Sequence, residues 1–248
     1  MKMEYVRRSI LAACVLTSLT ACSSSEATST SRTLTQQEAA DLAQSINKNY
    51  VEGGAKFIVS TVIAPGQGAI QLAGTIDWKN HVGSASVSAS VADSTLQGVV
   101  WGTNAIAENR PAFEAQLSTF GRAKPYFIVR KPNMNRRLDQ IVAVVMGLAA
   151  EQPENSQLIL QKPGSMYLRE DVLRNEAVRV LRYGERNVFW IAKDSGLLLR
   201  FEGSNELGNQ PIIIDFSEHG IHKVGFPAEV HLVNAEAHEE VMQMTSGF

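Results

Sequence analysis

The stretch IQLAGTIDWKNHVGSASVSA, residues 70–89, decides the fold of this chain. Ile70, Leu72 and Ile76 share one face of its first half. In its second half, alanines and valines alternate with serines. A period of two predicts extended strands, and two of them joined by a short turn predict an antiparallel pair.

Further segments with the same alternation lie on both sides of this pair. Gly, Pro, Asn or Asp separates them, as expected of strands joined by short turns. They are residues 57–63, 96–101, 113–117, 126–130, 177–183, 187–193, 197–203 and 211–216. Several short strands at near-regular spacing predict a meandering antiparallel sheet.

Two segments have a helical period instead. Thr35 and Glu38 form a capping-box pattern at the start of a helix predicted for 35–51. A second apolar face at every third or fourth position predicts a helix over 135–150. Helix, strands, helix and strands in separate blocks indicate an α+β fold with an antiparallel sheet. We expect one domain, residues 34–248, with a loose tail after about residue 233.

The first 33 residues are typical of an exported protein. Basic Lys2, Arg7 and Arg8 precede an uncharged run and small residues that end at Cys22. This pattern predicts a signal peptide, residues 1–21, that is removed. Residues 22–33 are almost wholly Ser, Thr and small residues, and we expect them to form a flexible tether.

Composition excludes several classes of function. The net charge is −2 and the basic residues are scattered, so no nucleic-acid partner is expected. Both cysteines, Cys14 and Cys22, precede the domain, so no thiolate nucleophile or Cys-ligated metal is expected in it. His219 and His222 have a spacing that a metal could use, but Gly220 indicates a loop and exposed histidines are the better interpretation. We expect no catalytic residues, no metal and no cofactor, and therefore no enzyme.

Three motifs resemble a known group of envelope proteins. Residues 19–22, Leu-Thr-Ala-Cys, are similar to the lipobox of bacterial lipoproteins. Residues 75–83 and 190–200 resemble a strand-turn-strand and a late hairpin of the LolA/LolB-like superfamily, and more closely the actinobacterial lipoproteins of the LppX/LprG type. The resemblance implies that Cys22 is lipidated. It also implies that the sheet curls into a half-barrel whose concave face is partly covered by helices.

By the same resemblance, the concave face encloses an apolar cavity for acyl chains. Several strands are apolar on both faces, so both sides of the sheet need cover. The residues expected to border the cavity have large apolar side chains, except Gly74, whose missing side chain would leave space. They are Leu72, Gly74, Ile76, Trp78, Trp101, Phe127, Phe189, Trp190 and Phe201. Ordinary core packing is the alternative for each of them. If space exists at Gly74, Gly74→Trp should fill it at little cost in stability.

The expected function is binding of lipid acyl chains and their carriage or presentation across the cell envelope. The lipid on Cys22 would hold the protein on the extracytoplasmic face of the cell membrane. Lipid or a lipidated ligand, and another envelope protein, are the expected partners. The alternative is an envelope protein-interaction or stress-sensing module of the same fold without transport activity.

Overall fold

The computed structural model describes residues 31–62, 68–90, 95–204 and 211–245. In these residues a single 13-stranded sheet forms the frame of the molecule. Its strands are β1 (Arg32–Thr33), β2 (Gly54–Val62), β3 (Ala69–Asp77), β4 (Val82–Ala89), β5 (Gly98–Trp101), β6 (Ile106–Asn109), β7 (Phe127–Arg130), β8 (Met166–Leu173), β9 (Glu176–Tyr183), β10 (Asn187–Ala192), β11 (Leu198–Ser204), β12 (Pro211–Ser217) and β13 (Leu232–Asn234). The α-helices are α1 (Gln36–Glu52), α2 (Glu114–Leu117), α3 (Arg137–Gly147), α4 (Ser156–Gln161) and α5 (Glu239–Met242).

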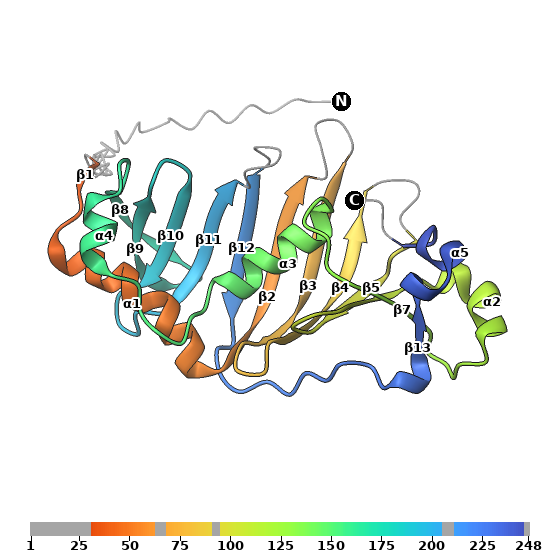
Figure 1. Ribbon diagram of the computed structural model, residues 1–248. Helices are drawn as coiled ribbons and strands as arrows, with labels where there is room; N and C mark the ends of the chain where they lie inside the picture. The colour runs from red at the N-terminus through yellow and green to blue at the C-terminus, as the bar shows by residue number, and fades with distance from the viewer. Residues whose placement is uncertain (1–30, 63–67, 91–94, 205–210, 246–248) are drawn as a thin grey trace, which may run out of the picture.

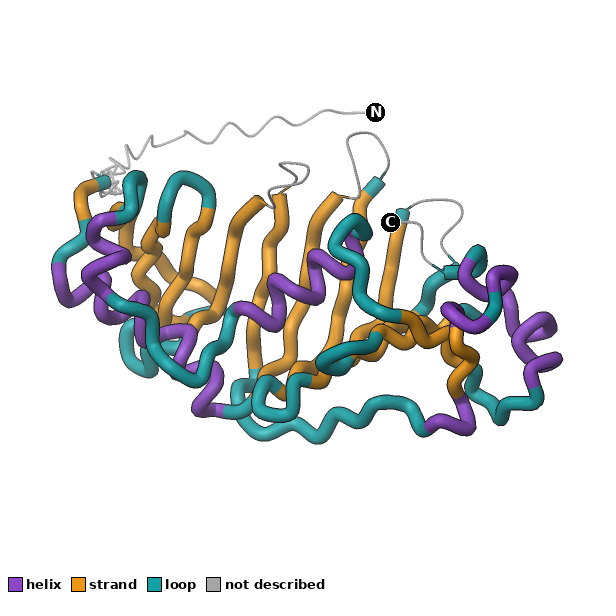
Figure 2. Tube along the Cα trace, in the orientation of Figure 1, coloured by secondary structure: helices purple, strands orange, loops and turns teal. Residues whose placement is uncertain are grey.

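The sheet is open, and its strands run in the order β1-β8-β9-β10-β11-β12-β2-β3-β4-β5-β6-β7-β13. Among the described strands, β13 pairs with β7 in parallel, and every other pair is antiparallel. Helices α1, α3 and α4 lie across the concave side of the curved sheet (Figures 1 and 2). The predicted α+β class, with helices covering the concave face of a curved sheet, is confirmed. None of the described helices is long and apolar enough to span a membrane.

The stretch 70–89 forms β3, a tight turn and β4. Leu72 pairs with Val87 and Gly74 with Ala85, so the alternating apolar residues of both strands share the concave face. The turn is held by the Asp77 carboxylate, which accepts hydrogen bonds from the backbone and the side-chain amide of Asn80 at 3.0 and 2.7 Å. Local sequence therefore determines both the pairing and its register.

Helix α1 starts and stops as its sequence predicts. The Thr35 hydroxyl accepts from the Glu38 backbone N–H at 3.2 Å, and the Glu38 carboxylate accepts from the Thr35 N–H at 2.9 Å. Gly53, with a φ of 100°, ends the helix in a conformation that residues with a Cβ rarely adopt. Asp41 pairs with Arg179 of β9, which attaches the helix to the sheet.

The main hydrophobic core lies between the concave face and the helices. It joins residues such as Phe57, Ile214 and Phe216 of the sheet to Leu42 of α1 and Ile141 of α3. Two smaller clusters exist: one on the opposite, convex face of β9, β10 and β11, and one where α2, β7, β13 and α5 meet.

Three expectations at the margins of the domain are wrong. Residues 113–117, predicted as a strand, are helical, because Pro111 begins a 3₁₀ turn that runs into α2 and its fixed φ suits a first helical turn. The tail after residue 233 is not loose: Val233 and Val241 are buried in the cluster of α2, β7 and α5. The expected tether also ends early, since Arg32 and Thr33 pair with β8.

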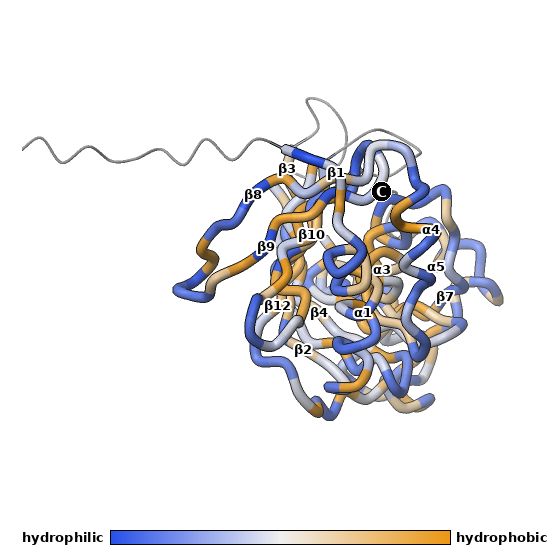
Figure 3. Tube along the Cα trace, turned by 90° about the vertical axis from the view of Figure 1, so that its left-hand side faces the viewer, coloured by the Kyte–Doolittle hydropathy of each residue, from blue (hydrophilic) through white to orange (hydrophobic). Residues whose placement is uncertain are grey.

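The convex face is covered less completely than the apolar pattern predicts. Ile58 of β2 and Ile213 of β12 are both exposed there, with 45% and 37% of their surface in solvent. The β9–β11 part does carry a buried cluster, next to the β8–β9 hairpin that extends away from α1 and α4 (Figure 3). The apolar residues of the convex face are thus buried on β9, β10 and β11, whereas Ile58 and Ile213 on β2 and β12 remain exposed to solvent.

Candidate functional site

The concave face brings together most of the side chains expected to border a cavity. Leu72, Ile76 and Trp101 are buried on this face of β3 and β5, and Phe189 and Phe201 continue it on β10 and β11. The indole of Trp78, just after β3, donates to the backbone carbonyl of Val145 in α3 at 3.2 Å. The helix that covers the middle of this face is thereby joined to the floor beneath it.

Aromatic pairs contribute to this apolar face at two separate places. Phe57 packs against Trp101 with ring centroids 5.9 Å apart, and Phe189 meets Phe201 edge-on at 5.2 Å. Such tilted and edge-on arrangements are the favourable ones for aromatic rings. The result is a wide apolar face that α1, α3 and α4 shield from water.

Trp190 is not part of this surface. It neighbours Phe189 in an extended strand, so the two side chains must point to opposite faces. Trp190 lies in the convex cluster, and the guanidinium groups of Arg169 and Arg200 lie 5.1 and 5.4 Å from its ring centroid. Strand alternation alone could have separated these two aromatic residues.

Phe127 also points away from the concave face. In β7 its neighbour Ile128 pairs with Glu108, which shares a face with Ile106 of the main core. Phe127 therefore lies on the opposite face, where it is half-buried. The face on which Phe127 lies follows from the register between β6 and β7, and the sequence alone does not show that register.

Gly74 does face the concave side, but no room is left beside it. A Cβ atom built on Gly74 would come within 1.9 Å of the Ser84 carbonyl oxygen and 2.7 Å of the Ala85 Cα. The glycine allows β4 to approach closely, so it is not an unfilled part of a cavity. The expectation that Gly74→Trp would be tolerated is therefore wrong.

An apolar pocket of about 330 Å³ lies along one side of α3. Helix α3 contributes Val142, Ala143 and Met146, and the sheet contributes Trp101 and Ile106. The volume is at the lower end of the range for small-molecule sites, and such sites are mostly apolar. Methionine adapts its shape to irregular partners. Of these residues, only Trp101 is among those that the sequence predicts at the border of a cavity, although the helical period places Val142 and Met146 on one side of α3.

Charged groups at the edge of this pocket neutralise one another. The Asp139 carboxylate, which lines the pocket, binds Arg130 at 2.6 and 2.7 Å, and Glu108 accepts from both Arg130 and Arg110. Burial alone would lower the pKa of Arg130, but its hydrogen bonds and charge interactions with Asp139 and Glu108 raise that pKa above the usual value of an arginine. This network holds β6, β7 and the start of α3 together.

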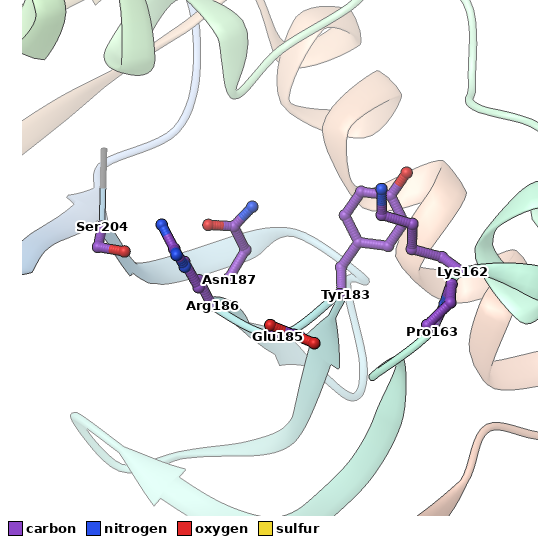
Figure 4. A pocket seen from close by; sticks show the side chains of 8 residues that line it. Lys162, Pro163, Tyr183, Glu185, Arg186, Asn187 and Ser204 are labelled. Atoms are coloured by element: carbon purple, nitrogen blue, oxygen red, sulfur yellow. The ribbon is translucent and has the colours of Figure 1, made fainter. Parts of the chain in front are cut away.

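A larger and more polar pocket, of about 610 Å³, opens at the turn between β9 and β10. Lys162 and Tyr183 stand on one side of it and Arg186 and Asn187 on the other, with Glu185 between them (Figure 4). Its charges are of both signs, and none of the residues expected to border the cavity lines it. Among the described residues, no group of three or more His, Cys, Asp or Glu side chains is arranged to hold a metal ion.

No family model matches the chain, and no curated protein matches it. Solved structures are similar to it at low sequence identity. The lipoprotein LppX of Mycobacterium tuberculosis is 13% identical with a TM-score of 0.45, over 75% of this chain and 97% of LppX. LprF from Mycobacterium bovis is 11% identical with a TM-score of 0.44, over 77% of this chain and 97% of LprF.

A domain ascribed to outer membrane lipoprotein sorting, from Vibrio parahaemolyticus, is 10% identical with a TM-score of 0.30, over 74% of this chain and 92% of that domain. The solved structures similar to this chain thus include the lipoprotein LppX and a lipoprotein-sorting domain.

Proposed function

We propose that this protein is an envelope lipoprotein that binds lipid acyl chains on the concave face of its sheet and carries or presents them across the envelope. Its lipidated Cys22 would hold it on the extracytoplasmic face of the cell membrane. The proposed role is binding, without catalysis. One observation carries the proposal: the apolar pocket beside α3 reaches the buried apolar face of the sheet, because Trp101 and Ile106 belong to both.

The energetics of acyl chains fit such a surface. Each CH₂ group removed from water contributes about 0.8 kcal/mol. A long chain can therefore leave a bilayer only if a protein shields most of its length. The pocket offers a starting point, and the floor beneath α3 offers further apolar surface if the helix moves aside.

The test uses the full chain with Cys22→Ala, purified without detergent, so that the protein's own anchor does not obscure bound lipid. Organic extraction followed by mass spectrometry should detect copurified lipid. Ala143 lines the pocket and is exposed, so Ala143→Trp should obstruct the pocket at little cost in stability. If the added indole keeps two CH₂ groups of the fatty acid out of the pocket, binding loses about 1.6 kcal/mol. The affinity for a fluorescent fatty acid should therefore fall roughly tenfold.

Gln44→Trp is the matched control, because it adds the same indole at an exposed position of α1 away from the pocket. It should bind lipid as the parent protein does. A parent protein that neither copurifies with lipid nor binds the fatty acid would contradict the proposal and favour a protein-interaction module.

A further inference from the structure

Arg137, the first residue of α3, is a buried cation without a counter-charge among the residues that the structure describes. Only 8% of its surface is exposed. One terminal nitrogen donates to the Thr61 hydroxyl at 2.6 Å, while its buried Nε has no hydrogen-bond partner. No carboxylate of the described residues lies within ion-pair distance of it. Burial lowers the pKa of Arg137, and no charge within the described part of the chain offsets the effect.

The other buried arginines of this region are compensated. Arg130 is paired with Asp139 and Glu108, and Arg110 with Glu108. Burying an ion costs several kcal/mol unless a partner and further hydrogen bonds repay it. Arg110 and Arg130 therefore have carboxylate partners, whereas Arg137 has none among the described residues, and packing does not explain this difference.

Thr61 cannot neutralise this charge. Its hydroxyl accepts from Arg137 and lies 2.5 Å from the Pro211 carbonyl oxygen, to which it donates. Thr61 pairs with Ile70 on one side and Ile212 on the other, and both are buried apolar residues of the main core. The guanidinium thus lies at the rim of the apolar floor, beside the start of α3, whose backbone N–H groups also favour an anion.

We propose that Arg137 binds the anionic group of a lipid, a carboxylate or a phosphate, whose apolar part lies on the concave face. This inference rests on the proposed function and names the class of lipid. The pocket lies on the side of α3 towards β5 and β6, and Arg137 on the side towards β2 and β12. An amphiphile that displaces α3 from the floor would meet both, with its charged end at Arg137.

The experiment measures binding of oleate, oleyl alcohol and acetate to the full Cys22→Ala chain, by titration calorimetry. Oleate should bind more tightly than oleyl alcohol, and acetate should not bind measurably. Arg137→Met should weaken oleate binding roughly tenfold to a hundredfold, the range for a hydrogen-bonded charge, and leave oleyl alcohol unchanged. Arg137→Lys, which keeps the charge, should retain part of the preference for oleate.

Arg122→Met is the control for loss of a positive charge, because Arg122 is exposed and lies outside the concave face. Thermal melting of each variant excludes loss of folding as the cause. Oleate binding that survives Arg137→Met, or equal binding of oleate and oleyl alcohol by the parent protein, would overturn this inference and leave the proposed function standing. If acetate binds as tightly as oleate, Arg137 binds a small free anion and not the anionic group of a lipid, which would also overturn this inference. Failure of both long-chain ligands to bind the parent protein would overturn the proposed function as well.

Discussion

At the scale of single residues, the backbone of β4 leaves no room for a side chain at Gly74 on the concave face. Leu72, Gly74 and Ile76 do share the concave face, as their spacing predicts. Whether a glycine leaves a void depends on how closely the next strand approaches, and that distance is a property of the assembled sheet. The burial of Arg137 was unpredictable for the same reason: its surroundings come from β2 and β12, far away in the sequence.

The close approach at Gly74 can be tested with one methyl group. Gly74→Ala should destabilise the protein by about 1–3 kcal/mol, the cost of overpacking, because its Cβ would meet backbone atoms that cannot move alone. Gly98→Ala is the control: its nearest neighbours would lie 3.6 and 3.7 Å away, an ordinary contact. Urea unfolding measures both. Equal stability of the two variants would contradict the packing described at Gly74.

At the scale of elements, a strong periodic pattern of apolar residues predicts the helices and strands correctly, and a weak pattern does not. The helix predicted for 35–51 and the strands predicted for 177–216 are present nearly as expected. Strand β8 escaped prediction because Arg169, Glu170 and Asp171 interrupt its apolar pattern. Helix α4 was missed because it is only one and a half turns long. Segment 113–117 is both short and weakly patterned, so Phe113 and Leu117 fit a short strand and a helical turn equally well.

The start of α1 gives the protein a defined response to acid. Hydrogen bonding from Arg32 is the main cause that lowers the pKa of Glu38 from 4.5 to about 2. A carboxyl with a lowered pKa in the folded state adds stability above its unfolded value, and this stability disappears as the pH falls from about 4.5 to 2. Glu38→Gln should keep the cap hydrogen bonds and lose this dependence.

Melting temperatures between pH 6 and pH 2 provide the measurement. Arg32 is exposed, so solvent screens the pair, and we expect a small difference in melting temperature that shrinks as the pH falls from about 4.5 to 2. Glu176→Gln, at an exposed position of β9, should keep the full acid response of the parent protein. If Glu38→Gln and the parent protein lose stability in parallel, the Arg32–Glu38 pair is not responsible.

At the scale of the whole molecule, the order of secondary-structure blocks predicted the class, and the resemblance predicted the curvature. The segments predicted to address the protein to the envelope, a signal peptide at 1–21 and a lipobox-like sequence at 19–22, lie outside the described residues. Cys22→Ala should release the protein from the membrane fraction, because one acyl chain or none gives only marginal attachment. Cys14→Ala should leave it attached, since that cysteine is part of the predicted signal. Fractionation and labelling with a fatty-acid probe measure both, and a Cys22→Ala protein that still labels would contradict the anchor.

The way the sheet ends has a consequence for many copies crowded on one membrane. An exposed edge strand invites another chain to add to it, and anchoring in two dimensions raises the local concentration at which such edge-to-edge polymerisation occurs. On one side the sheet ends with β1, which has two residues, and the adjacent β8 carries Arg169, Glu170 and Asp171. On the other side it ends with β13, which has three residues and leads directly into a helical segment. Both ends of the described sheet are too short or too charged to template a neighbour, so copies held side by side by the proposed anchor would not pair edge to edge through these strands.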